Sequence, residues 1–179
     1  MRIITGIYKG RHFDIPRSFK ARPTTDFAKE NIFNVLNGYM DLEDAKALDL
    51  FSGTGSISYE LLSRGCSSVV SVEGDRQHAQ FISQCVNKLG TDKHILIRGD
   101  VFKFMKGCHE QFDFIFADPP YSLPELPKIP SLVFEYNLLN DDGLFVFEHG
   151  KQHNFYDHPH FLDHRTYGSV NFSIFRKGE

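Results

Sequence analysis

The sequence of 179 residues contains no tryptophan and only three cysteines, Cys66, Cys85 and Cys108. Because the cysteines are scattered and form no CxxC pair, we expect neither a disulfide framework nor a metal site. No apolar run approaches the roughly 18 residues that a membrane span needs. The first residues also lack the hydrophobic stretch of a signal peptide. These absences predict a cytoplasmic protein.

The composition is that of an ordinary globular protein, with 41% hydrophobic and 24% charged residues. The length suits one domain with a well-buried core and is too short for two of ordinary size. No internal repeat and no low-complexity segment is visible. The 18 phenylalanines indicate a Phe-rich core rather than a row of stacking platforms for bases.

The charge of the chain is unevenly distributed. A net charge of −3 argues against a protein that coats nucleic acid. The first 22 residues nevertheless contain six basic residues and one acid, Asp14; the basic residues are Arg2, Lys9, Arg11, Arg17, Lys20 and Arg22. A basic arm on an acidic body can attract phosphates locally. The alternative is a solvated run of charges.

The start of the chain predicts a hairpin followed by a helix. Residues 2–15 are expected to form two short strands with turns at Gly6 and Gly10. Thr24 or Thr25 is a candidate helix N-cap, and apolar residues at helical spacing follow as far as Tyr39. Asn37-Gly38 supplies the stop signal for this helix.

From residue 45 onward, strand-like and helix-like segments alternate. Strands are expected at 46–51, 68–73, 94–98, 112–117 and 143–148, and helices at about 56–64, 76–89, 101–106 and 131–139. Such alternation predicts an α/β fold with a parallel sheet and helices on both faces. Residues 161–176 are expected to form an antiparallel hairpin at the sheet edge. Residues 122–131, which contain three prolines, predict an irregular loop.

A glycine-rich turn follows the first parallel strand, in the segment Asp49–Gly55. Gly53 and Gly55 allow the backbone to turn sharply and approach a ligand. Glu73 ends the second strand, where an acid can accept hydrogen bonds from ribose hydroxyls, and Asp100 ends the third, within reach of an adenine amino group. The segment therefore predicts a nucleotide-containing cofactor, although a plain structural turn is the alternative.

The details of this turn favour S-adenosylmethionine over a dinucleotide. A dinucleotide fingerprint requires a third glycine, and Ser58 stands at that position. Asp49 would repel a pyrophosphate but suits the ammonium group of a methionine moiety.

The tetrad Asp118-Pro119-Pro120-Tyr121 follows the apolar fourth strand. An exocyclic amine on a base is a poor nucleophile, because its lone pair is delocalised into the ring. A carboxylate and the carbonyl of Pro119 could accept both amine hydrogens, while the prolines fix these acceptors in place. Tyr121 could stack on the base, and a base inside a duplex would first be flipped out. The alternative is a simple strand-ending turn.

Several motifs together carry a resemblance to a known family. They are Met1-Arg2-Ile3-Ile4 with Gly6, Lys9-Gly10-Arg11, Arg22-Pro23-Thr24-Thr25-Asp26 with Glu30, Phe33 and Asn34, Asp49–Gly55, Ser63-Arg64-Gly65, Val72-Glu73, Gly99-Asp100, the tetrad, Glu148-His149 and Tyr167-Gly168. With these motifs the chain resembles, nearly end to end, the bacterial small-subunit ribosomal RNA guanine-N2 methyltransferases of RsmD type. Tetrads of this kind occur in many amino-methyltransferases, whereas the segment at 22–26 with that at 9–11 is far more specific.

The resemblance implies a Rossmann-like class I methyltransferase fold whose seven-stranded sheet is mostly parallel and ends in the antiparallel hairpin. It implies an RNA-contacting extension at residues 1–40 and a methyltransferase domain at 41–179. It also implies methylation of a guanine in 16S rRNA, on assembled small subunits, by a protein that we take to be a monomer with no bound metal and no membrane partner.

The resemblance also implies roles for individual residues. The catalytic residues would be Asp118, Pro119, Pro120 and Tyr121; the residues that bind S-adenosylmethionine would be Asp49, Phe51, Gly53, Gly55, Glu73, Asp100 and Val101; the residues that contact RNA would be Arg2, Lys9, Arg11, Arg22, Thr24, Thr25 and His149. Two departures concern the RNA contacts, since the stretch after the tetrad is short and proline-rich, and His149-Gly150-Lys151 replaces the usual His-Ser-Lys.

Three other functions remain open at this point. The first is an adenine-N6 or other base-amino methyltransferase that acts on DNA or a different RNA. The second is a nicotinamide-dependent oxidoreductase, and the third is a non-catalytic RNA-binding protein. Five histidines between residues 149 and 164 could in principle bind metal, but ordinary packing is the better interpretation because they lack fixed ligand spacing.

Overall fold

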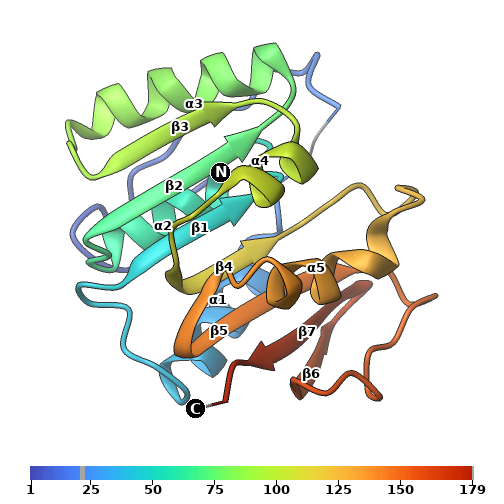
Figure 1. Ribbon diagram of the computed structural model, residues 1–179. Helices are drawn as coiled ribbons and strands as arrows, with labels where there is room; N and C mark the ends of the chain where they lie inside the picture. Colours follow the sequence, from blue (N-terminus) through green and yellow to red (C-terminus); the bar gives the residue numbers. More distant parts are fainter. Residues whose placement is uncertain (21–22, 179) are drawn as a thin grey trace.

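A central sheet organises the computed structural model, which describes residues 1–20 and 23–178 (Figure 1). The strands are β1 (Lys46–Leu50), β2 (Ser68–Glu73), β3 (His94–Arg98), β4 (Phe112–Ala117), β5 (Leu139–His149), β6 (Phe161–Tyr167) and β7 (Val170–Arg176). Within the described residues they form one seven-stranded sheet in the order β3-β2-β1-β4-β5-β7-β6. The first five strands are parallel, and β7 runs antiparallel to both β5 and β6. The predicted sheet and its C-terminal hairpin are confirmed.

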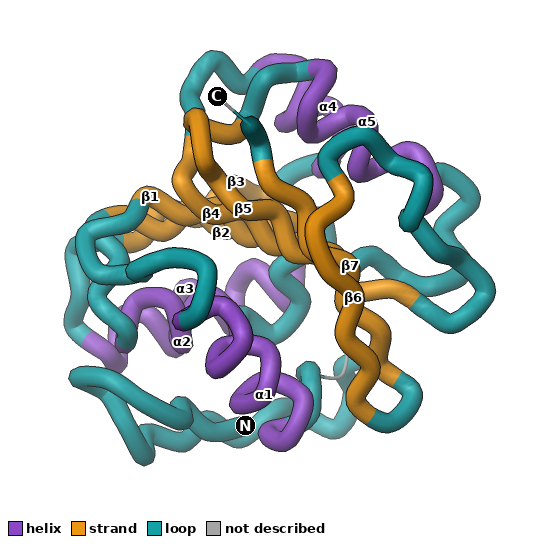
Figure 2. The backbone as a smooth tube through the Cα atoms, turned by 90° about the horizontal axis from the view of Figure 1, so that it is seen from below, coloured by secondary structure: helices purple, strands orange, loops and turns teal. Residues whose placement is uncertain are grey.

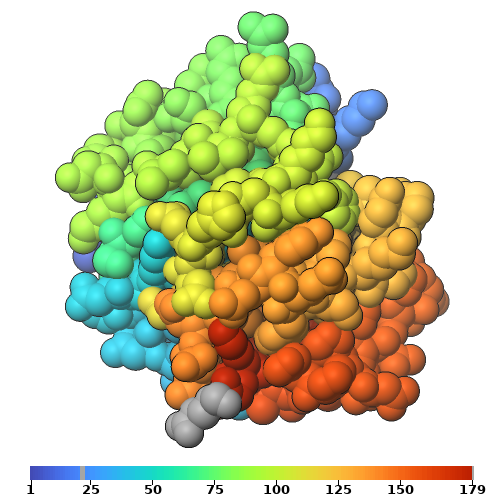
Figure 3. Space-filling view, viewed as in Figure 1, coloured from blue at the N-terminus to red at the C-terminus, as the bar shows by residue number. Residues whose placement is uncertain are grey.

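Helices cover both faces of the sheet (Figure 2). They are α1 (Asp26–Asn37), α2 (Ser56–Ser63), α3 (Arg76–Leu89), α4 (Val101–Gly107), the 3-10 turn η1 (Leu126–Lys128) and α5 (Ile129–Glu135). Helices α1, α2 and α3 lie on one face, and α4 and α5 lie on the other. In Figure 3 the face turned to the viewer has residues of α4 and α5 in its middle, with residues of α3 and β3 above them and residues of the C-terminal part below. In the part of the chain that the structure describes, no helix has the length and apolar character to cross a membrane.

The central strands are buried on both faces, so their residues are almost continuously apolar. Ala47 in β1 packs on the side of α1 and α2, while its neighbour Leu48 packs on the side of α4 and α5. Strand β4 divides in the same way, with Phe114 on the first side and Ile115 on the second. This double burial anchors the sheet, and the carboxyl ends of its parallel strands are held at one edge.

Helix α1 forms where the sequence predicts it. The Thr25 hydroxyl accepts a hydrogen bond from the Ala28 amide at 3.2 Å, which caps the helix, and the helix ends at Gly38. Its buried residues Ile32 and Phe33 belong to the same hydrophobic core as β1 and β4. The two predicted parts of the chain therefore share one core, and the boundary at residue 40 stays a prediction.

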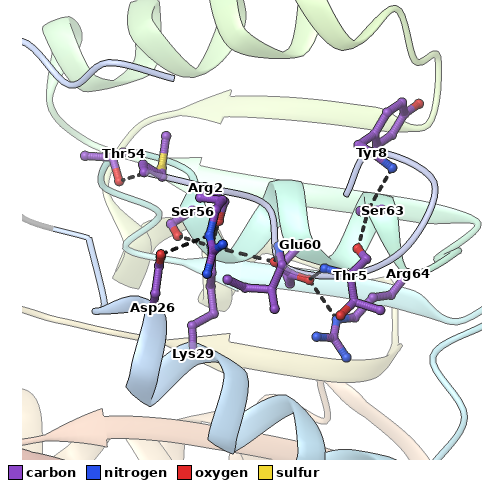
Figure 4. Close-up of polar contacts among 12 residues, drawn as sticks. Arg2, Thr5, Tyr8, Asp26, Lys29, Thr54, Ser56, Glu60, Ser63 and Arg64 are labelled. Atoms are coloured by element: carbon purple, nitrogen blue, oxygen red, sulfur yellow. Dashed lines mark hydrogen bonds and ion pairs between the residues drawn. The ribbon is translucent and has the colours of Figure 1, made fainter. Parts of the chain in front are cut away.

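The N-terminal segment does not form the two expected strands. Among the described residues its two arms pair only briefly: a bridge joins Arg2 and His12, the Ile3 amide donates to the Arg11 carbonyl at 2.9 Å, and the Phe13 amide donates to the Met1 carbonyl at 3.0 Å. The backbone amides of Ile4 and Thr5 instead donate to the buried carboxylate of Glu60 in α2, at 2.8 and 3.1 Å (Figure 4). Gly6 lies so close to the Ser63 carbonyl that a β-carbon would collide with it. Helix α2 thus accepts hydrogen bonds from two amides of the N-terminal segment.

The region before β5 also differs from the expectation of a helix at 131–139. The helix α5 begins at Ile129 and ends at Glu135, and β5 begins at Leu139 rather than at residue 143. Asn137 adopts a left-handed conformation (φ 53°), which ends the helix. A shift in the pairing of β4 with β5 lets Leu139 join the sheet ahead of Leu144.

Candidate functional site

A cavity of about 790 Å³ lies at the carboxyl ends of the parallel strands. Ligands of open α/β sheets bind at this edge. The described lining residues come from the N-terminal segment, from β1 with the following turn and the start of α2, from the end of β2 with the start of α3, from β4 with the tetrad, and from β5. They are Lys20, Pro23, Thr24, Asp49, Phe51, Ser52, Gly53, Thr54, Ser56, Ile57, Glu73, Asp75, His78, Phe116, Asp118, Pro119, Pro120, Tyr121 and Glu148.

The turn between β1 and α2 forms part of the cavity wall. Gly53 and Gly55 both have positive φ angles, 58° and 84°. A β-carbon on Gly55 would collide with the ring of Tyr59, whose hydroxyl donates to the Thr54 carbonyl at 2.8 Å. The sharp turn therefore requires glycine there. It brings the first residues of α2 to the cavity wall, where free backbone amides suit a carboxylate ligand.

Asp49 lies in β1, just before this turn, and is 1% exposed. Its carboxylate accepts a hydrogen bond of 2.6 Å from the hydroxyl of Ser58. Burial raises the pKa of Asp49 to about 7, although the Ser58 bond opposes the shift. Ser58, which replaces the third glycine of a dinucleotide fingerprint, thus holds the acid in place.

Glu73, at the end of β2, fixes the shape of the turn. One of its oxygens accepts from the Gly53 amide at 2.7 Å, and the other accepts from the Asp75 amide at 2.8 Å. His78 Nδ1 lies 3.6 Å from the carboxylate. Each carboxylate oxygen can accept more than one hydrogen bond, so Glu73 retains acceptor capacity toward the cavity.

The tetrad also lines the cavity. Asp118 directly follows β4 and is partly buried, while Tyr121 is 37% exposed at the rim. Loss of water raises the pKa of Asp118 well above its usual range, and the neighbouring carboxylate of Glu148 raises it further. Burial and the same glutamate also raise the pKa of Tyr121.

Glu148 is the main site residue that the sequence prediction of roles missed. It is buried in β5 and faces the cavity. One oxygen accepts a hydrogen bond from the Thr24 hydroxyl at 2.8 Å, and the other accepts from the Tyr121 hydroxyl at 3.0 Å. The motif Glu148-His149 does not show which of its two residues faces the cavity, because the residues before it in β5 are all buried and apolar.

The structure does not bring His149, a predicted RNA-contacting residue, into the cavity. His149 is fully buried and does not line the cavity. Its ring nitrogens lie 2.8 Å from the Gly150 carbonyl and 2.7 Å from the Ser173 hydroxyl. Because successive side chains of a strand point to opposite faces, placing Glu148 in the cavity turns His149 into the core.

Three of the predicted cofactor residues lie outside the lining. Gly55 shapes the turn, and Val101 is buried in the core of α4. Asp100 is exposed, and its carboxylate caps α4 by accepting from the Lys103 amide at 2.9 Å. Direct contacts of these residues with a cofactor stay predictions.

The predicted RNA-contacting residues are dispersed. Thr24 lines the cavity, whereas Thr25 caps α1. Arg2 pairs with Asp26 at 3.2 Å and Arg11 donates to the Lys88 carbonyl at 2.9 Å, both at exposed positions outside the cavity. Lys9 is exposed as well, and Arg22 lies outside the described residues. Sequence reasoning did not assign Lys20 or His78 to the site, although both line it.

The charge of the cavity selects the kind of ligand that fits. Five acids line it, namely Asp49, Glu73, Asp75, Asp118 and Glu148, whereas Lys20 is the only lysine or arginine among the described lining residues. Such a lining suits a ligand with positive charges, and S-adenosylmethionine carries an ammonium and a sulfonium. It disfavours a pyrophosphate. Among the described residues, no three His, Cys, Asp or Glu side chains form a group that could hold a metal ion.

Comparisons with known proteins agree with this geometry. The model of the family described as conserved hypothetical protein 95 matches residues 1–176. YlbH of Bacillus subtilis is 35% identical over 156 residues, which cover 85% of this chain and 84% of that protein. Ribosomal RNA small subunit methyltransferase D of Haemophilus influenzae is 30% identical over 182 residues, covering 98% and 93%. The solved structure of yhhF from Escherichia coli matches with a TM-score of 0.87 and 25% identity, covering 99% and 98%.

Proposed function

The chain belongs to the conserved hypothetical protein 95 family, that of the RsmD-type methyltransferases, and from this premise we propose that it methylates the N2 amine of a guanine in 16S rRNA. The Rossmann-like class I methyltransferase fold expected from the resemblance is confirmed. Its cofactor is S-adenosylmethionine. The observation that carries the proposal is that Asp49, Glu73 and the tetrad line the same acidic cavity.

The residues around the turn between β1 and α2, together with Glu73, would hold the cofactor. Asp49 lies where a carboxylate can meet the ammonium of the methionine part, and the amides at the start of α2 can meet its carboxylate. Glu73 has acceptor capacity for the ribose hydroxyls. When bound, S-adenosylmethionine supplies an electrophilic methyl group.

The tetrad would prepare the guanine amine. The Asp118 carboxylate and the Pro119 carbonyl accept its two hydrogens, which favours a pyramidal nitrogen with a free lone pair. Two consecutive prolines hold both acceptors, so little reorganisation is needed at the moment of reaction. The raised pKa of Asp118 makes this carboxylate a stronger base for the proton that the amine loses. Tyr121, at the rim, offers its ring for stacking.

The RNA would be held outside the cavity by the basic N-terminal segment. Lys9 and Arg11 are exposed there, and Lys20 lies at the cavity itself. The proposal takes the substrate to be the assembled small subunit and the enzyme to be a monomer. An enzyme with this substrate works where ribosomes are built, which places it in the cytoplasm.

The test offers methyl-labelled S-adenosylmethionine together with unmodified small subunits, naked ribosomal RNA or duplex DNA. The proposal expects label in the small subunits and N2-methylguanosine in the nucleoside digest. The second candidate, a base-amino methyltransferase for adenine, predicts N6-methyladenosine instead. Label in DNA alone would contradict the ribosomal substrate.

A further inference from the structure

Two carboxylates stand side by side at the substrate end of the cavity. In the ladder between β4 and β5, Ala117 pairs with Phe147, so the next residues along the two parallel strands are Asp118 and Glu148. Neighbouring strands lie about 4.8 Å apart. Both side chains line the same cavity. A planar base that presents its edge to one of them therefore presents it to the other.

Glu148 is held as an acceptor rather than as a partner of a cation. The hydroxyls of Thr24 and Tyr121 bind one oxygen each, and within the described residues no lysine or arginine pairs with it. A carboxylate has about four lone-pair positions, so two hydrogen bonds leave capacity free. The two hydroxyls also fix the orientation of the group, since it is buried and bound on both oxygens.

The bases differ in the hydrogen-bonding character of the ring nitrogen next to their exocyclic amine. Guanine carries its N2 amine next to the N1–H group, so the edge presents donors at two adjacent positions. Adenine and cytosine carry their amines next to an unprotonated ring nitrogen, which is an acceptor. A pair of adjacent carboxylates can accept from both positions of the guanine edge, but it meets a lone pair on either of the other bases.

We propose that Glu148 is a specificity-determining residue that accepts the N1–H of guanine while Asp118 accepts the N2 amine. This inference rests on the proposed function and names the feature that selects guanine. Adenine and cytosine are rejected largely through repulsion between the Glu148 carboxylate and the lone pair of their ring nitrogen. The buried carboxylate loses water when such a base binds and gains no hydrogen-bond donor in return. A site built to bind a donor rejects an analogue that lacks it far more strongly than one that differs in shape alone.

The empty cavity disfavours ionisation of both acids. Burial raises the pKa of Asp118, and the adjacent negative charge of Glu148 raises it further. Two N–H donors from guanine offset that repulsion and let both groups stay ionised. A base with one donor and one acceptor would instead require one carboxyl group to keep its proton.

The test uses small subunits reconstituted with guanine or 2-aminopurine at the methylated position. The analogue keeps the N2 amine but has an unprotonated N1. For the natural enzyme, kcat/KM should be about 100-fold or more higher on guanine. In Glu148→Gln the amide can donate to N1, so activity on guanine falls and the preference shrinks at least about tenfold. Glu148→Asp, which keeps the carboxylate, should retain a preference for guanine.

Thr24→Val is the matched control, because it removes one hydrogen bond to Glu148 without removing the charge. It should slow both substrates alike and leave their ratio unchanged. If Glu148→Gln kept the natural ratio, Glu148 would not read N1 and the inference would be overturned. The analogue also lacks the 6-oxo group, but a preference due to that group would survive in Glu148→Gln and so count against the inference.

Should Glu148→Gln prove inactive on both substrates, binding of the two subunits to the variant is measured directly, together with its melting temperature. A folded variant that binds the analogue as well as the guanine substrate supports the inference, and one that keeps the natural preference overturns it. Failure of the natural enzyme to methylate guanine would remove the proposed function and the inference with it. Efficient methylation of guanine without discrimination against the analogue would remove the inference alone.

Discussion

At the scale of single residues, the site depends on acids whose ionisation the fold shifts. Asp49 and Asp118 line one cavity at the ends of the neighbouring strands β1 and β4, and burial raises the pKa of each. Their positions followed from the sequence, because each comes directly at the end of a parallel strand. The shifts did not, because they depend on neighbours such as Ser58 and Glu148 that the fold brings together.

Replacing Asp118 by Ala should abolish methyl transfer while cofactor binding largely survives. The reason is that Asp118 belongs to the tetrad proposed to act on the base, whereas Asp49 and Glu73, which line the same cavity, are proposed to bind the cofactor. Transfer is followed with labelled methyl donor, and affinity for S-adenosylmethionine is measured by calorimetry. Equal loss of both properties would contradict this division of roles.

The raised pKa of Asp49 predicts how the stability of the cofactor-free protein depends on pH. Because the folded-state pKa of about 7 exceeds the unfolded value of 3.8, the neutral acid favours folding. This contribution is complete below pH 3.8, and it is lost progressively as pH rises through 7. The loss amounts to at most about 4 kcal/mol.

Urea unfolding of the natural protein and of Asp49→Asn, at several pH values between 5 and 8, measures this contribution. The difference in free energy of unfolding between the two proteins should change with pH in this window, with Asn relatively more favourable at pH 8. A difference that stays constant would mean that Asp49 is ionised throughout.

Glu148 shows where prediction at the residue scale ends. Phe145, Val146 and Phe147 are buried on both faces of β5, so the strand has no polar alternation that indicates which face meets the cavity. The motif alone therefore does not indicate which of Glu148 and His149 faces the cavity. Only the register of β5 against β4 separates them.

At the scale of secondary structure, elements with local signals were predicted well and those shaped by distant contacts were not. Helix α1 has its own cap at Thr25 and its own stop at Gly38. The N-terminal segment pairs with itself only around Arg2 and His12 and forms no regular strands, because Glu60, more than 50 positions along the chain, accepts two of its amides. No local pattern contains that information.

The Glu60 carboxylate is the main link between α2 and the N-terminal segment. It is fully buried, accepts from Arg64 at 2.9 Å and lies 3.6 Å from the buried ammonium of Lys29 (Figure 4). Glu60→Ala would leave that ammonium without its partner and should lower the free energy of unfolding by roughly 3–5 kcal/mol. Hydrogen exchange at Ile4 and Thr5 should also become faster.

The control for this variant is Glu30→Ala, which removes an exposed acid from α1. It should change the free energy of unfolding by no more than about 0.5 kcal/mol. If the two variants were equally stable, the buried network would contribute nothing to the attachment of the N-terminal segment.

At the scale of the whole molecule, the chain places its basic segment and its acidic cavity on one body of net charge −3. Replacing Arg11 and Arg22 together by Gln should weaken RNA binding and reduce the slope of log K against log salt by about 0.7–0.9 for each lost phosphate contact. Lys128→Gln changes a lysine of η1, next to α5 on the other face of the sheet, and should leave the slope unchanged. An unaltered slope in the double variant would mean that neither arginine touches phosphate.

The hydrogen bond from Thr24 to Glu148 joins positions 124 residues apart. The part of the cavity wall at Thr24 is therefore synthesised long before the part at Glu148. No short fragment can contain a complete pocket, and an enzyme split anywhere between these positions would work only after its halves reassociate. The pocket is complete only late in translation, after strand β5 with Glu148 has been synthesised and has joined the sheet.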